Sequence, residues 1–125
     1  MGLSGKHGNN LFSKPSDLKE GSYNGVGGNI EFPCTSVSEF MKKESHKKID
    51  LLKIDIEGFE YGVIDDIFRN KIDISQIVLE FHGWMKGIPK AFDKIAKKKL
   101  KRLGYVVVFK SNNDYTFVKK ELIID

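Results

Sequence analysis

The chain contains, twice in succession, an apolar strand followed by an amphipathic helix. In "IDLLKIDIEG", residues 49–58, the closely spaced Ile and Leu residues indicate a buried strand, which Gly58 ends. The next residues, "FEYGVIDDIF", place apolar side chains at helical spacing. The second pair is the strand "ISQIVLEFH" and a helix over 89–103, whose first turn tolerates Pro89. This repetition predicts right-handed βαβ units on a parallel sheet that is covered on both faces by helices.

The end of the sequence predicts an antiparallel addition to that sheet. Gly104 is a plausible carboxy-terminal cap for the second helix. After it, "YVVVFK" and "YTFVKKEL" have the composition of strands, and the turn-prone residues "SNND" between them favour a hairpin. The fold class is therefore α/β, with a C-terminal antiparallel hairpin.

A length of 125 residues and a mass of 14.2 kDa allow one domain. We divide it into a loop-rich lead-in over 1–36 and an α/β core over 37–125. The lead-in is rich in Gly, Asn and Ser and has room only for short strands, near 10–13 and 29–32. The core begins with a short helix over 37–44, because Ser36 and Glu39 have the spacing of a capping box.

The composition narrows the range of partners. The net charge is +4, but only Arg69 and Arg102 of the 21 basic residues are arginine, and base readout and phosphate clamps favour arginine. We therefore regard nucleic acid as an unlikely partner and expect a solvated, lysine-rich helix face. No apolar run has the length of a membrane span, the amino terminus lacks the apolar core of a signal peptide, and Cys34 has no second cysteine to pair with. These observations favour a cytoplasmic protein.

Ionisable residues stand where the two central strands end. Strand alternation puts Lys53, Asp55 and Glu57 on one face, and His82 follows the second strand. Because the carboxyl ends of parallel strands meet at one edge, where α/β proteins usually bind ligands, we take Asp55, Glu57 and His82 as candidate catalytic residues. Charges on a buried strand are costly unless they are paired or used.

Other interpretations of these residues stay open. Lys53 can be an ion-pair partner of the carboxylates, and Glu60 can serve the positive end of the helix dipole. His82 can be a second base, a hydrogen-bonded structural residue, or part of a metal site with Glu80, Asp55 and Glu57. We assign no metal ligands from the sequence. Trp84, in the loop after His82, can line a pocket or cover the edge of the sheet.

The segment around Asp55 carries a resemblance to a known family. Residues 53–60, "KIDIEGFE", match the pattern K-I-D-[IV]-E-G-[AF]-E of the FkbM-type S-adenosylmethionine-dependent methyltransferases. The upstream "TSVSEF", the strand "IVLEFHG" and the late "LGY" also resemble family segments. The resemblance extends over about 5–120 and is strongest over 49–83.

The resemblance implies a Rossmann-like class I methyltransferase sheet of seven strands in the order 3-2-1-4-5-7-6. The four expected strands correspond to strands 4-5-7-6, which makes this a partial sheet, the carboxy-terminal half of such a domain. No segment before Ile49 has the strand and glycine-rich turn that hold the cofactor's methionine part. We therefore expect S-adenosylmethionine as the cofactor, bound weakly, and weak or no activity of these 125 residues alone.

The resemblance also implies roles for the candidate residues. Asp55 and Glu57 would contact the acceptor, remove its proton or shape the cofactor's edge, and no other cofactor-binding residue is identified. The acceptor would be a sugar or another small polar molecule, methylated on oxygen. The alternative is a non-enzymatic remnant or interaction module, which pairs with a partner chain or with itself through the exposed edge of the strand over 49–56.

Overall fold

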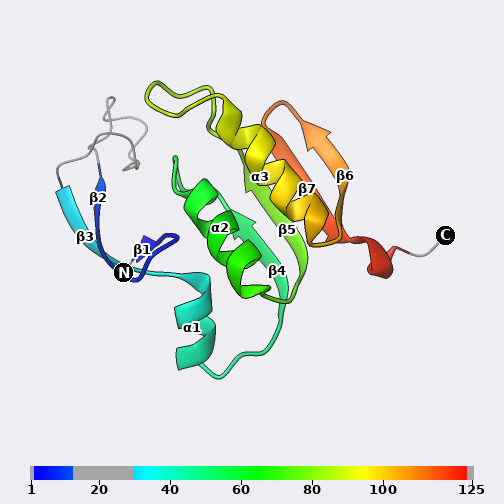
Figure 1. Cartoon of the computed structure of the whole chain (residues 1–125), viewed down its shortest axis with the longest axis horizontal. Coiled ribbons are helices and arrows are strands. Elements are labelled where there is room, and N and C mark those ends of the chain that lie inside the picture. Colours follow the sequence, from blue (N-terminus) through cyan, green and yellow to red (C-terminus); the bar gives the residue numbers. More distant parts are fainter. Residues whose placement is uncertain (1, 13–29, 124–125) are drawn as a thin grey trace.

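The computed structural model describes residues 2–12 and 30–123, which form two sheets and three α-helices (Figure 1). The smaller sheet has the strand order β1-β3-β2 and the larger one β4-β5-β7-β6. In chain order the elements are β1 (Gly2–Leu3), β2 (Gly8–Phe12), β3 (Ile30–Thr35), α1 (Val37–Lys43), β4 (Ile49–Ile54), α2 (Glu60–Asn70), β5 (Ile74–Glu80), α3 (Ala91–Arg102), β6 (Tyr105–Ser111), β7 (Asp114–Lys119) and the 3-10 turn η1 (Lys120–Leu122).

The larger sheet has the mixed topology that the sequence predicts. β4 and β5 are parallel, and β7 lies between β5 and β6, antiparallel to both. The hairpin turn is tighter than the four residues expected, because the strands extend to Ser111 and Asp114 and leave only Asn112 and Asn113 between them. Asn112 has a φ of 53°, a left-handed conformation that asparagine tolerates well.

The expectation of helices on both faces is wrong for the described residues. α2 joins β4 to β5 and α3 joins β5 to β6, so both crossovers advance in the same direction across the sheet. Two right-handed crossovers in one direction put their helices on the same face, and α2 and α3 pack side by side there (Figure 1). The opposite face carries Leu51 and Phe109, each 57% exposed.

The core lies between this sheet and its two helices. α2 contributes one apolar stripe and α3 a narrower one, as their helical spacing predicts. The buried apolar side chains from these helices and from β4, β5 and β7 include Ile54, Val63, Ile64, Ile67, Ile74, Ile77, Leu79, Leu100 and Phe117. Each buried side chain of this size stabilises the fold by about 1.5–3 kcal/mol relative to an exposed position. α3 ends at Arg102 with Leu103 as its cap, and Gly104, the residue predicted to end the helix, follows with a φ of 92°.

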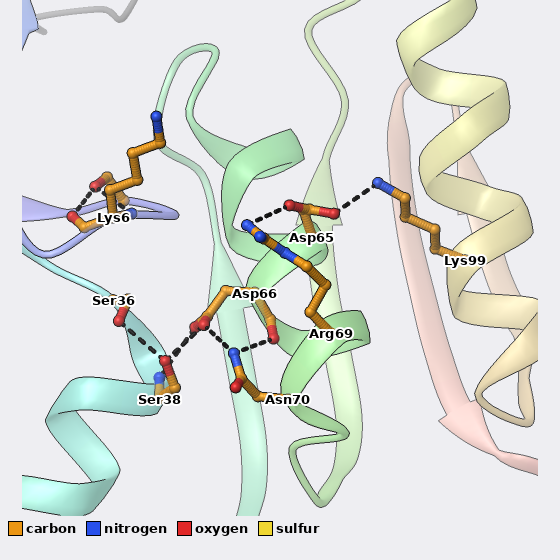
Figure 2. A network of polar contacts seen from close by, with 9 residues as sticks. Lys6, Ser36, Ser38, Asp65, Asp66, Arg69, Asn70 and Lys99 are labelled. Atoms are coloured by element: carbon orange, nitrogen blue, oxygen red, sulfur yellow. Dashed lines mark hydrogen bonds and ion pairs between the residues drawn. The ribbon is translucent and has the colours of Figure 1, made fainter.

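Polar contacts made by α2 join it to the helices on either side (Figure 2). Buried Asp66 accepts hydrogen bonds from the backbone N–H and hydroxyl of Ser38, at 3.0 and 2.5 Å, and from the Asn70 amide at 2.8 Å. On the exposed side, Asp65 pairs with Arg69 at 2.8 Å and with Lys99 of α3 at 3.0 Å. Both contacts fix α2, one toward α1 and one toward α3.

The first turn of α1 has the cap that the sequence predicts. The Ser36 hydroxyl accepts a hydrogen bond from the Glu39 N–H at 3.2 Å, and α1 then runs to Lys43. The same hydroxyl lies 3.1 Å from that of Ser38, which connects the cap to Asp66.

The lead-in forms the smaller sheet, with strands close to the two expected positions. β3 pairs with β1 in parallel and with β2 antiparallel, and the expectations for residues 13–29 lie outside the described residues. This segment touches the core at Gly5, where an added Cβ would overlap the backbone of Gly62 on α2. Two backbones meet there without a side chain between them.

β4 is the edge strand of the larger sheet within the described residues. It ends at Ile54, two residues earlier than predicted, so Asp55 and Ile56 already belong to the following turn. Among the helices described, none has the length and apolar character needed to cross a membrane.

Candidate functional site

The turn between β4 and α2 brings two carboxylates to the carboxyl end of the sheet. Asp55 follows the last residue of β4, and Glu57 and Gly58 reverse the chain with φ values of 51° and 105°. Gly58 takes this conformation freely, whereas Glu57 takes it at a cost of about 1 kcal/mol. Residues held in such conformations gather at functional sites, because surrounding contacts must maintain them. The turn directs the Glu57 side chain toward β5.

A buried ion-pair partner holds His82 beside this turn. His82 is 1% exposed, and its Nδ1 lies 2.7 Å from Oε1 of Glu60, which is fully buried at the first position of α2. Because a carboxylate only accepts hydrogen bonds, Nδ1 is the protonated ring nitrogen, and its N–H donates a hydrogen bond to Glu60. The other Glu60 oxygen accepts the Gly58 N–H at 3.0 Å. Glu60 therefore fixes both the turn and the orientation of the imidazole ring.

The other ring nitrogen points at three more carboxylates. Nε2 of His82 lies 3.8 Å from Oδ1 of Asp55, 3.8 Å from Oε2 of Glu57 and 3.9 Å from Oε2 of Glu80. These distances exceed those of a hydrogen bond. Ligand atoms of Asp55, Glu57 and His82 all lie within 4.8 Å of one another. We call Asp55, Glu57, Glu80 and His82 the carboxylate–histidine site.

The electrostatics of the site reflect this excess of negative charge. Burial lowers the pKa of His82, but the hydrogen bond to Glu60 and the charges of Glu60, Glu57 and Glu80 outweigh it, so the pKa lies above its usual value. Burial raises the pKa of Glu80, against the opposing effect of His82, and Asp55, Asp114 and Glu57 raise it further. The site thus favours an added positive charge.

Lys53, which the sequence suggests as an ion-pair partner of Asp55 and Glu57, does not neutralise them. Within residues 2–12 and 30–123, Lys53 forms no ion pair with Asp55 or Glu57. It lines instead a small pocket of about 110 Å³ below the site, on the sheet face without helices. The side chains of this pocket are Lys53, Ile54, Asp55, Val78, Leu79, Glu80 and Asp114.

The loop after β5 is anchored on its other side. The His82 N–H donates to the Tyr61 hydroxyl at 3.0 Å, and that hydroxyl donates to Asp93. Burial and then the bond to Asp93 raise the pKa of Tyr61 far above its usual value, so Tyr61 stays a neutral donor. Trp84 remains 63% exposed, with its ring 5.8 Å from the His82 ring.

The structure brings together the three predicted catalytic residues, Asp55, Glu57 and His82. Sequence reasoning missed the role of Glu60, for which the helix dipole was a sufficient explanation. The sequence did contain a signal for this contact. Glu60 begins the helix after β4, and His82 follows β5, so the two residues lie at the same edge of two parallel strands. Cys34 is buried in β3.

The chain is similar to a known protein family. A family model described as the methyltransferase FkbM domain matches residues 3–107, a range that includes β4, α2, β5 and all residues of the carboxylate–histidine site and ends within β6. No curated protein matches the chain, and no solved structure matches it.

Proposed function

Because the chain belongs to the FkbM methyltransferase domain family, we propose that it transfers a methyl group from S-adenosylmethionine to a hydroxyl of a sugar or another small polar molecule. The observation that carries this proposal is the convergence of Asp55, Glu57 and His82 at the carboxyl ends of β4 and β5. Ligands of open α/β sheets bind at that end.

The topology supports the proposal. The order β4-β5-β7-β6, with β7 antiparallel, agrees with the order 4-5-7-6 that the resemblance implies for one half of a class I methyltransferase sheet. On this equivalence the end of β4 faces the transferred methyl group. The turn at Glu57 and Gly58 would then border the reaction.

The charge of the site fits the cofactor. The sulfonium of S-adenosylmethionine is a cation, and four carboxylates surround His82, the closest of them Glu60. When bound, the cofactor supplies an electrophilic methyl group. No segment before Ile49 combines an apolar strand, a glycine-rich turn and a helix, so we expect the methionine and ribose parts of the cofactor to be held weakly.

The chain's own residues would orient and deprotonate the acceptor. Asp55 and Glu57 have side chains that are 49% and 33% exposed, so a hydroxyl can reach both of them. Either carboxylate can accept the hydroxyl proton as the oxygen attacks, because methyl transfer needs mainly positioning and proton removal. His82, held by Glu60, limits where these carboxylates can move.

The test is transfer of radiolabelled methyl groups at millimolar cofactor to a panel of sugars and other polyols. We expect slow transfer that falls at least 100-fold in Asp55→Asn or Glu57→Gln. Asp50→Asn, at the other end of β4 and 94% exposed, is the matched control and should keep the full rate. Full transfer by both site variants would refute the site assignment, and no transfer to any acceptor would refute the activity.

A second candidate function rests on β4 as an edge. β4 is unpaired on one side within the described residues and carries Leu51, 57% exposed, so it offers backbone groups to another strand. The chain would then act as an interaction module that pairs with a partner or with itself. Size-exclusion chromatography over a concentration series tests self-pairing, for which we expect a dimer. A monomer at all concentrations would contradict self-pairing.

A further inference from the structure

The proposed reaction uses the negative charge of the site, but it does not explain why three carboxylates lie around one nitrogen of a buried imidazole. Oxygens of Asp55, Glu57 and Glu80 lie 3.8–3.9 Å from Nε2 of His82, while Nδ1 is already paired with Glu60. The His82 side chain is 1% exposed, and the distances from its Nε2 to these three carboxylates exceed those of a hydrogen bond. Carboxylates that crowd together without a cation repel one another.

From this geometry we infer that Asp55, Glu57 and His82 bind a divalent transition-metal ion such as Mn²⁺ or Zn²⁺. The three ligand atoms lie within 4.8 Å of one another and come from the ends of two adjacent parallel strands. In a tetrahedral site with bonds of about 2.1 Å, neighbouring ligand atoms are about 3.4 Å apart. The distances of 3.8 Å from Nε2 to Asp55 and Glu57 need to shorten by only a few tenths of an ångström.

The environment of His82 has a second property of metal sites. A ligating histidine usually donates its remaining ring N–H to a carboxylate, which fixes the tautomer and aims the free nitrogen at the ion. The pair of His82 Nδ1 and Glu60 Oε1, at 2.7 Å and fully buried, has this arrangement. Glu60 is in turn fixed by the Gly58 N–H, so the turn, the carboxylate and the ring form one support.

The ligand types narrow the choice of ion. One imidazole nitrogen with two carboxylates suits Mn²⁺, Co²⁺ and Zn²⁺, whereas Mg²⁺ prefers oxygen ligands and octahedral geometry. Glu80, 3.9 Å from Nε2, lies close enough to become a further ligand or to bind a coordinated water. Exposure of Asp55 and Glu57 leaves a path for the ion and for an acceptor oxygen.

A role for the ion rests on the proposed function, whereas its binding does not. In a methyltransferase, the ion would coordinate the acceptor hydroxyl and ease the loss of its proton to a site carboxylate.

Binding is measured on the purified chain without cofactor, with Co²⁺ as the probe. Trp84 is the only tryptophan and lies 5.8 Å from His82, so a paramagnetic ion in the site quenches its fluorescence, and the visible spectrum of Co²⁺ reports the coordination. We expect one ion per chain, displaced by Zn²⁺ and Mn²⁺ but not by equal Mg²⁺. Asp55→Asn and Glu57→Gln should each weaken Co²⁺ binding at least 10-fold, and Glu60→Gln by 10-fold or more.

The matched control is Asp50→Asn, which removes one carboxylate from the far end of the same strand and should change the affinity less than twofold. Melting curves confirm that each variant is folded; both site substitutions are on partly exposed side chains. Absence of quenching in the unaltered chain, or equal affinity in the site variants and Asp50→Asn, would overturn the inference. Methyl transfer with and without a chelator separates the two proposals. Transfer unaffected by the chelator would contradict a role for the ion in the reaction, and ion binding without any transfer would contradict the methyltransferase activity.

Discussion

Two buried carboxylates on α2, Glu60 and Asp66, differ in what they are bonded to. Asp66, 4% exposed, accepts hydrogen bonds from neutral groups of Ser38 and Asn70, and these contacts occupy both of its oxygens. Glu60, fully buried, is bonded to the ring of His82 and to the turn at Gly58, and His82 then faces three further carboxylates.

The difference separates a structural carboxylate from a positioning one. The contacts of Asp66 stay within α2 and the start of α1, and they join these two helices (Figure 2). The contact of Glu60 continues through an imidazole to an open edge of the sheet, where ligands bind. Substitutions at the two positions should therefore differ both in stability and in what happens at the carboxylate–histidine site.

The largest effect is expected for Glu60→Ala. It leaves the buried His82 ring without its partner, and breaking a buried charge pair costs about 3–5 kcal/mol in free energy of unfolding. Urea denaturation followed by circular dichroism measures this loss. Glu60→Gln, which keeps the shape and an acceptor, should lose less. A loss in Glu60→Ala smaller than that in Asp66→Ala would break the comparison.

Asp66→Ala should come second, with a loss of about 2–3 kcal/mol, because hydrogen bonds to a charged group are removed and buried donors of Ser38 and Asn70 lose their acceptor. The same denaturation experiment measures it. Co²⁺ affinity of the folded variant, measured by Trp84 quenching, should stay within twofold of the unaltered chain. A tenfold change would show that Asp66 also acts on the site.

A smaller effect is expected for Ser36→Ala, which sharpens the structural side of the comparison. The substitution removes the α1 cap to the Glu39 N–H and the contact with the Ser38 hydroxyl, and loss of a cap costs about 1 kcal/mol. For a domain of this size the melting temperature should fall by about 4 °C. An unchanged melting temperature would mean that this cap adds nothing to stability.

The smallest effect concerns Asp65, the exposed neighbour of Asp66. The hydrogen bond from Lys99 is the largest cause that lowers its pKa below 3.8; burial opposes it, and the charges of Lys99 and Arg69 add to it. A lowered folded-state pKa stabilises the protein above the ordinary value, and this stabilisation is lost as the pH falls through the folded value. Asp65→Asn should cost about 0.5 kcal/mol at pH 7 and less near pH 2. Thermal melts at both values measure it, and an equal loss at both would contradict the ion-pair explanation.

The sequence predicts those parts of the fold that depend on local pattern. The spacing of apolar residues identifies α2, α3 and the four strands of the larger sheet, because each pattern reports which face of one element is buried. It does not report which face of the sheet a helix covers, since that depends on the direction of the crossover; the expectation of two covered faces failed for this reason. β1 has only two residues and carries no pattern.

The candidate site is predictable only where it follows from strand ends. Asp55, Glu57 and His82 terminate neighbouring parallel strands, and topology alone brings such positions together. Glu60 was explained by its own helix, and nothing local indicates that its partner lies 22 residues away. The left-handed conformation of Glu57 is likewise invisible in the sequence, because it is imposed by contacts around the turn.

The contact between Gly5 and Gly62 has a mechanical consequence. No side chain separates the two backbones, so a displacement of the segment before β2 toward α2 would press directly on the first turn of that helix. Glu60 stands only two residues before Gly62, so the contact at Gly5 also helps to position the carboxylate that holds the His82 ring. A methyl group added at Gly5 would displace the start of α2, and through Glu60 this displacement would reach the imidazole ring of His82, which is distant in the sequence.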